Sequence, residues 1–249
     1  FQRQPLESNN SSFVMSEIII SSNTEDLGVF NLLSDSYLLT SCYNSQVVRS
    51  QWQSMFERVE VVETRIAQSS LLGVLTVGNN NGILLPSTTN DEEMAKIAMM
   101  VPEKIEVARL ESFLNLGNVI KANDTLAVIS GERHKFSPDD LETIQKVLKV
   151  EELLYMNSRD DTGLFNFNDF VMNNNIAASS CWLPALLQEQ LGSFDIPNIH
   201  NFTINRGNQS LSTGLLINDT MALCGKNTTV CERDAISHVF FASQIQERD

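Results

Sequence analysis

The stretch KANDTLAV, Lys121–Val128, has a counterpart in LINDTMAL, Leu216–Leu223. Both contain Asn-Asp-Thr followed by an apolar residue, alanine and a second apolar residue, and their asparagines lie 95 positions apart. A chance recurrence of a six-residue pattern is one explanation. The other is an internal repeat with a period of about 95 residues or an integer fraction of it, as in propellers, solenoids and arrays.

Glycine spacing favours the internal repeat. Gly28, Gly73, Gly117 and Gly214 each precede an Asn- or Asp-rich turn, at spacings of 45, 44 and 97 residues. Because the last spacing is close to two of the others, the pattern predicts a further unit near residue 167, where Phe167 stands in place of the glycine. The sequence therefore predicts five units of about 45 residues.

Each unit is predicted to consist of strand, turn, strand, helix and strand. The first strand follows the glycine, as in 74–77 and 119–120, and the strand after the helix alternates apolar and polar residues, as in RVEVVETRI, KIEVARL and HNFTIN. The second strands are predicted at Tyr37–Thr40, Ile83–Leu85, Leu126–Ile129 and Met221–Cys224. One unit cannot bury its own faces, so side-by-side packing in a closed ring is expected. A linear solenoid is the alternative, and closure is favoured because neither terminal unit resembles a polar cap.

Helix starts are predicted from capping residues. Ser137 can cap a helix that has Pro138 in its first position, with Leu141, Ile144 and Leu148 on its apolar face. Capping-box spacing predicts one helix that begins near Thr89, with Glu92, and another that begins near Thr229, with Glu232. A third helix is predicted between Pro184, near its start, and Gly192, where it should end. The segment SQWQSMF is the weakest helix prediction.

Composition and charge limit the classes of protein to which this sequence can belong. Of 249 residues, 42% are hydrophobic and the net charge is −14, which predicts a folded acidic protein. The charge argues against direct DNA binding and favours basic protein partners, and no apolar run is long enough to predict a membrane span. We expect a polar extension at 1–14, one five-repeat domain at 15–240 and a C-terminal tail at 241–249.

No catalytic or ligand-binding motif is evident. The cysteines (Cys42, Cys181, Cys224, Cys231) and the three histidines are scattered, so no metal site and no cofactor are expected. Cys224 or Cys231 could pair with His238, but the constellation that catalysis needs is not visible in the sequence. The seven Asn-X-Ser/Thr sequons, which include those at Asn123 and Asn218, are expected to be unmodified.

Four segments carry a family resemblance. GVLTVGNNNGILLPSTTNDEE, LESFLNLGNVIKANDTLAVI, KVLKVE and NRGNQSLSTGLLINDTMALCG strongly resemble the translation initiation factor 6 family, the ribosome anti-association factors of eukaryotes and archaea, and the resemblance extends over about Met15–Phe240. It implies an α/β fold, the pentein fold: a closed five-bladed pseudosymmetric α/β propeller of ββαβ repeats. The repeat count above agrees with it.

The resemblance also implies a function. Family members bind the large (60S) ribosomal subunit near the basic ribosomal protein uL14 and the sarcin–ricin loop, and sterically block joining of the small subunit. They act in large-subunit biogenesis and translation initiation, in the cytoplasm and the nucleus or nucleolus. Their release depends on an elongation-factor-like GTPase and the Shwachman–Diamond protein. No enzymatic activity, membrane partner or cofactor is implied.

The ribosome-facing positions of the family follow the repeat glycines. Transferred to this sequence they are Val29, Val74, Asn118, Asn168 and Leu215. Asn118 could equally be a turn residue, and the aliphatic residues could be strand core.

A different functional class remains open. Pentein-fold amidinotransferases and deiminases act on guanidino substrates with a C-terminal cysteine near a histidine. Here Cys224 is followed by Gly225, without an adjacent histidine.

Overall fold

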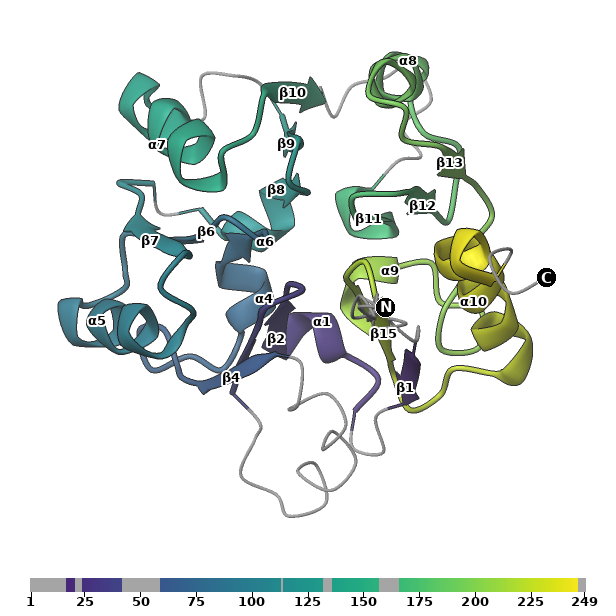
Figure 1. Ribbon diagram of the computed structural model, residues 1–249, viewed down its shortest axis with the longest axis horizontal. Coiled ribbons are helices and arrows are strands. Elements are labelled where there is room, and N and C mark those ends of the chain that lie inside the picture. The colour runs from purple at the N-terminus through teal and green to yellow at the C-terminus, as the bar shows by residue number, and fades with distance from the viewer. Residues whose placement is uncertain are drawn as a thin grey trace, which may run out of the picture.

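The computed structural model describes residues 17–20, 24–41, 59–112, 114–131, 136–156 and 166–245. Five small sheets are arranged around an axis, with one-turn helices near the centre and longer helices at the rim (Figure 1). The extension at 1–14, the segment SQWQSMF, Cys42 and His134 lie outside the described residues.

Each unit begins with one helical turn and an inner strand. The helical turns are α1 (Leu27–Phe30), α4 (Leu72–Leu75), α6 (Leu116–Val119), η2 (Phe167–Asp169) and α9 (Leu211–Gly214). The inner strands are β2 (Asn31–Leu33), β5 (Val77–Gly78), β8 (Ile120–Ala122), β11 (Phe170–Met172) and β14 (Leu215–Ile217). The first strands therefore begin later than predicted, since residues such as Val74 belong to the helical turn.

The middle strands, rim helices and outer strands complete the units. The middle strands are β3 (Tyr37–Thr40), β6 (Gly82–Leu85), β9 (Leu126–Ser130), β12 (Ala177–Ser179) and β15 (Met221–Cys224), which confirms the four predicted second strands. The rim helices are α5 (Asp91–Met100), α7 (Pro138–Leu148), α8 (Ala185–Ser193) and α10 (Val230–Ile245). The outer strands are β4 (Glu60–Glu63), β7 (Glu106–Arg109), β10 (Glu152–Met156), β13 (Asn198–Ile199) and β1 (Glu17–Ile20).

All five sheets have one topology. The inner strand is antiparallel to the middle strand, and the outer strand is parallel to it. In the fifth unit the outer strand is β1 from the start of the chain, with Ile18 opposite Ala222. The rim helix of that unit continues to Ile245, into the predicted tail. The five repeated sheets confirm the predicted α/β propeller of the pentein type.

The units contact one another in sequence around the axis. The inner strands touch in the order β2, β5, β8, β11 and β14, and β14 touches β2. Among the described residues, the hydrophobic core is divided into five clusters, each shared by two neighbouring units. Leu84 of β6, for example, packs in one cluster with Ala127 of β9 and Ile144 of α7. Because each apolar face is covered by the next unit, a single unit could not remain folded alone.

Glycine is required where the helical turns meet. A Cβ atom on Gly73 would lie 1.8 Å from the carbonyl oxygen of Gly28, and one on Gly117 would lie 1.9 Å from that of Gly73. In the same geometry a Cβ atom on Gly28 would lie 1.8 Å from the backbone carbonyl oxygen of Ser212. Ser212, and not Gly214, is therefore the counterpart of the repeat glycines in the fifth unit.

Two further local predictions were wrong. The capping box of α5 is formed by Asn90 and Glu93, one residue after the predicted pair, because the Asn90 side chain accepts from the Glu93 backbone at 2.8 Å. The strand predicted in HNFTIN lies earlier, at β13, although Phe202 and Ile204 are buried. The caps at Ser137 and at Thr229 with Glu232 are confirmed.

Candidate functional site at the two ends of the ring axis

The inner strands border two adjacent spaces along the axis. The space beside the helical turns has a volume of about 120 Å³, and the space beside the Asn- and Asp-rich turns has a volume of about 40 Å³. Both are bordered by one set of mainly apolar residues, Leu33, Gly78, Ala122, Met172 and Ile217. This set separates two chemically different ends of the molecule, which we call the helical-turn end and the Asx end.

At the Asx end, buried asparagines link each unit to the next. The Asn123 side chain accepts from the Thr125 and Leu126 backbone N–H groups and so closes its own turn. Its Nδ2 donates to the Asn173 carbonyl at 3.2 Å, and Asn173 donates in turn to the Asn218 carbonyl at 3.1 Å. The Asn218 Nδ2 donates to the Ser34 carbonyl at 2.9 Å and joins the fifth unit to the first. The doubled Asn-Asp-Thr motif is therefore structural.

The first unit has serine in place of this asparagine. Ser34 accepts from the Tyr37 backbone N–H but has no amide to donate onward. Tyr37 supplies the missing donor, because its hydroxyl donates to the Asn79 carbonyl at 3.1 Å. Burial raises the pKa of the Tyr37 phenol well above its ordinary value, so the hydroxyl keeps its proton.

The next residue of each turn forms a second ring of hydrogen bonds. Its members are Asp35, Asn80, Asp124, Asn174 and Asp219, and the backbone N–H of each donates to the side-chain oxygen of the next. Because the ring has an odd number of positions, aspartate and asparagine cannot alternate all the way around it. Two aspartates, Asp219 and Asp35, are therefore neighbours in the ring. Burial raises the pKa of Asp219, the hydrogen bond from Asn174 opposes this effect, and the charge of Asp35 adds to it.

The helical-turn end gathers four of the five predicted ribosome-facing residues. Val29, Val74, Asn118 and Asn168 each lie five residues before the Asn or Ser that closes the unit's turn, and all four are half-buried. They belong to α1, α4, α6 and η2. The first three lie around the centre of Figure 1, and η2 contacts α6 and α9.

Leu215 is not equivalent to these residues. It lies in β14 and is 1% exposed, whereas Thr213 of α9 occupies the corresponding position and is half-buried. The Thr213 backbone N–H donates to Ser210 as that of Asn118 donates to Asn115. Counting five residues back from Asn218, which closes its turn as Asn123 does, would have placed Thr213 correctly from the sequence.

Asn118 presents a free amide at this end. Its backbone N–H donates to the Asn115 carbonyl at 2.9 Å, while no hydrogen bond from its side chain is found within the described residues. Asn168 differs, because its Oδ1 accepts from the Ser212 hydroxyl at 3.4 Å and its backbone N–H donates to the Asn166 side chain. The two asparagines therefore have different capacities to bind a partner.

The cysteine singled out by sequence is buried. Cys224 lies at the end of β15 with 0% of its surface exposed, and burial raises the pKa of its thiol to about 12. No set of three His, Cys, Asp or Glu side chains in the described ranges is arranged to hold a metal ion. Within the same residues, no helix has the length and apolar character needed to cross a membrane.

The fold and the axial geometry define a class of protein: a five-bladed α/β propeller with equivalent residues of successive repeats gathered at one end of its axis. The eIF-6 family model matches residues 16–239. Eukaryotic translation initiation factor 6 of Drosophila melanogaster is 32% identical over 227 residues, which cover 90% of this chain and 90% of that protein. The corresponding factor of Saccharomyces cerevisiae is 30% identical over 233 residues, covering 88% and 87%.

Solved structures of other proteins also have partial similarity. The N-terminal domain of ArgZ, an arginine dihydrolase, has a TM-score of 0.47 at 13% identity and covers 70% of this chain and 66% of its own. A dimethylarginine dimethylaminohydrolase from Pseudomonas aeruginosa has a TM-score of 0.45 at 13% identity, covering 80% and 75%.

The chain belongs to the eIF-6 family. Its curated relatives carry the name of a translation initiation factor, and this supports a role in translation initiation.

Proposed function

We propose that this protein binds the large (60S) ribosomal subunit through its helical-turn end and sterically blocks joining of the small subunit. The observation that carries the proposal is the convergence of Val29, Val74, Asn118, Asn168 and Thr213 from five repeats onto one end of the axis. Equivalent loops that converge on one end of a repeat ring form a shared platform for a partner. Membership of the eIF-6 family supports a ribosome-related partner.

The wider setting is part of the same proposal. The basic ribosomal protein uL14 and the neighbouring sarcin–ricin loop would be the contacts on the subunit, and a net charge of −14 suits a basic protein partner. We further propose that an elongation-factor-like GTPase and the Shwachman–Diamond protein release the factor from the subunit. The factor would act in subunit biogenesis in the nucleus, nucleolus and cytoplasm.

We propose that the role is not enzymatic. An amidinotransferase or deiminase needs a thiolate that can reach its substrate, and the Cys224 thiol is buried with its pKa raised to about 12. Turnover of arginine or another guanidino compound, lost in Cys224→Ala, would favour the alternative function.

Co-sedimentation with purified large subunits tests the proposal. The wild-type protein should bind at physiological salt and reduce reassociation with small subunits. Asn118→Arg should weaken binding tenfold or more, about 1.4 kcal/mol, because it places a long charged side chain on the contact surface. Asn175→Arg is the matched control, since Asn175 is exposed at the Asx end. Equal loss of binding in both variants would reject the helical-turn end as the binding surface.

A further inference from the structure

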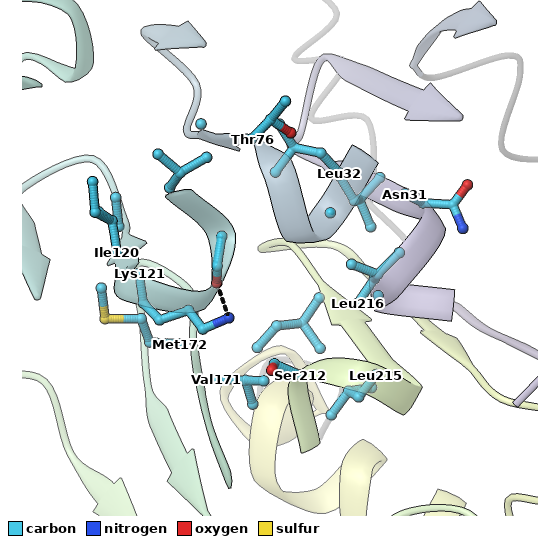
Figure 2. Close-up of a pocket in the computed structure, with 18 residues that line it drawn as sticks. Asn31, Leu32, Thr76, Ile120, Lys121, Val171, Met172, Ser212, Leu215 and Leu216 are labelled. Atoms are coloured by element: carbon cyan, nitrogen blue, oxygen red, sulfur yellow. Dashed lines mark hydrogen bonds between the residues drawn. The ribbon is translucent and has the colours of Figure 1, made fainter. Parts of the chain in front are cut away.

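One repeat places a charge where the other four have aliphatic side chains. Two residues before the Asn or Ser that closes each turn, the side chains are Leu32, Val77, Lys121, Val171 and Leu216. All five line the axial cavity of about 120 Å³ beside the helical turns. Figure 2 shows Lys121 extending from β8 toward the centre of this cavity. Because the other repeats fold with an aliphatic residue here, the fold itself does not require an ammonium group.

The Lys121 ammonium has few partners. Its Nζ donates to the Gly117 carbonyl at 2.8 Å and lies 5.9 Å from the ring centroid of Phe167. No salt bridge to Lys121 occurs within the part of the chain that the structure describes. An ammonium group has three N–H donors, and Lys121 is half-buried, so a partner for its charge would compensate the partial loss of hydration. The cost of burial is visible in the pKa of Lys121, which is lowered to about 8.

A second donor enters the cavity through another departure from the repeat. Ser212 replaces the glycine of the first three units and lines the same cavity. Its hydroxyl donates its single proton to Asn168 Oδ1 at the long distance of 3.4 Å, so it can donate to a ligand only by giving up this weak hydrogen bond. The other polar side chains of the lining are already engaged, since Asn31 donates to Leu27 and Thr76 donates to Leu72, both at 2.7 Å.

We propose that the axial cavity binds one small monovalent anion, of halide or formate size, against the Lys121 ammonium, with the Ser212 hydroxyl turning from Asn168 to act as second donor. The volume suits this ligand, because one water needs roughly 10–15 Å³ of such space and a small anion with a few waters fits within about 120 Å³. The carboxylates of the Asx end lie beyond the apolar border set by Leu33, Gly78, Ala122, Met172 and Ile217. The site does not depend on the proposed ribosomal role.

Thermal unfolding in sodium bromide or sodium formate, against sodium gluconate at equal ionic strength, tests the site. Gluconate is too bulky to enter, so the wild-type protein should have the higher melting temperature in bromide and formate. Lys121→Met should lose this difference, with an apparent affinity at least tenfold weaker, and Ser212→Gly should weaken it two- to fivefold. Lys146→Met removes an exposed lysine of α7 and should behave as the wild type.

Crystals of the wild-type protein soaked in bromide give the second readout. One anomalous peak beside the Lys121 Nζ, absent from Lys121→Met, is expected. Lys121→Met should fold, because the four equivalent positions are aliphatic. An equal bromide response in the wild type and Lys121→Met, or a cavity that contains only water in bromide, would overturn the proposal.

Discussion

The Tyr37 hydroxyl donates to the Asn79 carbonyl at 3.1 Å and so replaces the asparagine link that the first repeat lacks. It also lies 3.3 Å from the Gly82 carbonyl, so one buried hydroxyl faces two acceptors of the second unit. The remaining links between units are made by Asn79, Asn123, Asn173 and Asn218. The ring of hydrogen bonds is therefore continuous, although the first repeat lacks the asparagine that the other four repeats have.

Tyr37→Phe should destabilise the protein by about 1–3 kcal/mol, because it leaves buried carbonyl groups unsatisfied without opening a large cavity. Urea unfolding measures the change. Ser34→Asn in the Tyr37→Phe background should recover part of the loss by restoring the amide donor that other repeats use. Unchanged stability of Tyr37→Phe would show that this link contributes nothing.

Gly73→Ala should destabilise the protein by more than about 3 kcal/mol or prevent folding, because the new Cβ would lie 1.8 Å from the Gly28 oxygen. Gly192→Ala is the contrasting variant. Nothing lies within 4 Å of a Cβ atom at Gly192, which is in the last turn of α8. This variant should be more stable by roughly 0.5–1 kcal/mol, since alanine favours a helix. Circular dichroism during thermal unfolding compares the two.

Thr213→Arg should weaken binding to the large subunit about as much as Asn118→Arg, because both residues occupy the same position of the repeat. The variant also loses the hydrogen bond from the Thr213 hydroxyl to the Ser210 carbonyl, which should cost about 0.5–1.5 kcal/mol of stability but leave the protein folded. Leu215→Ala should act differently. The side chain is 1% exposed, so its truncation should cost about 2–5 kcal/mol of stability. Loss of ribosome binding by folded Leu215→Ala, but not by Thr213→Arg, would contradict the structural alignment of the fifth repeat.

Asp219→Asn should change how stability depends on pH. Burial and the charge of Asp35 raise the pKa of Asp219 in the folded state despite the hydrogen bond from Asn174, so the folded state binds more protons than the unfolded state above the ordinary pKa of 3.8. Relative to Asp219→Asn, the wild-type protein should lose stability as pH rises through the raised pKa of Asp219. Denaturant unfolding from pH 4 to pH 7 measures the difference. Parallel pH profiles would show that the pKa of Asp219 is not raised by folding.

The sequence by itself determined the number and order of the units. The turn chemistry of Asn123 and Asn218 and the apolar second strands are local properties, because each depends on residues close together in the chain. The recurrence of such local patterns about every 45 residues gives the period. The helix cap at Ser137 is equally local, and its side chain accepts from Asp140 as predicted. These features were therefore predicted correctly from residue pattern alone.

Only the tertiary structure decided how the units meet. Three features depend on contacts between residues far apart in the chain. The strand β1 completes the fifth sheet, Tyr37 replaces an asparagine as donor, and Ser212 corresponds to the repeat glycines. The same holds for Lys121, whose sequence neighbours give no sign that it faces an axial cavity. Local pattern specifies the strands and turns of one unit, whereas close backbone approach and shared hydrogen bonds between units fix the register around the axis.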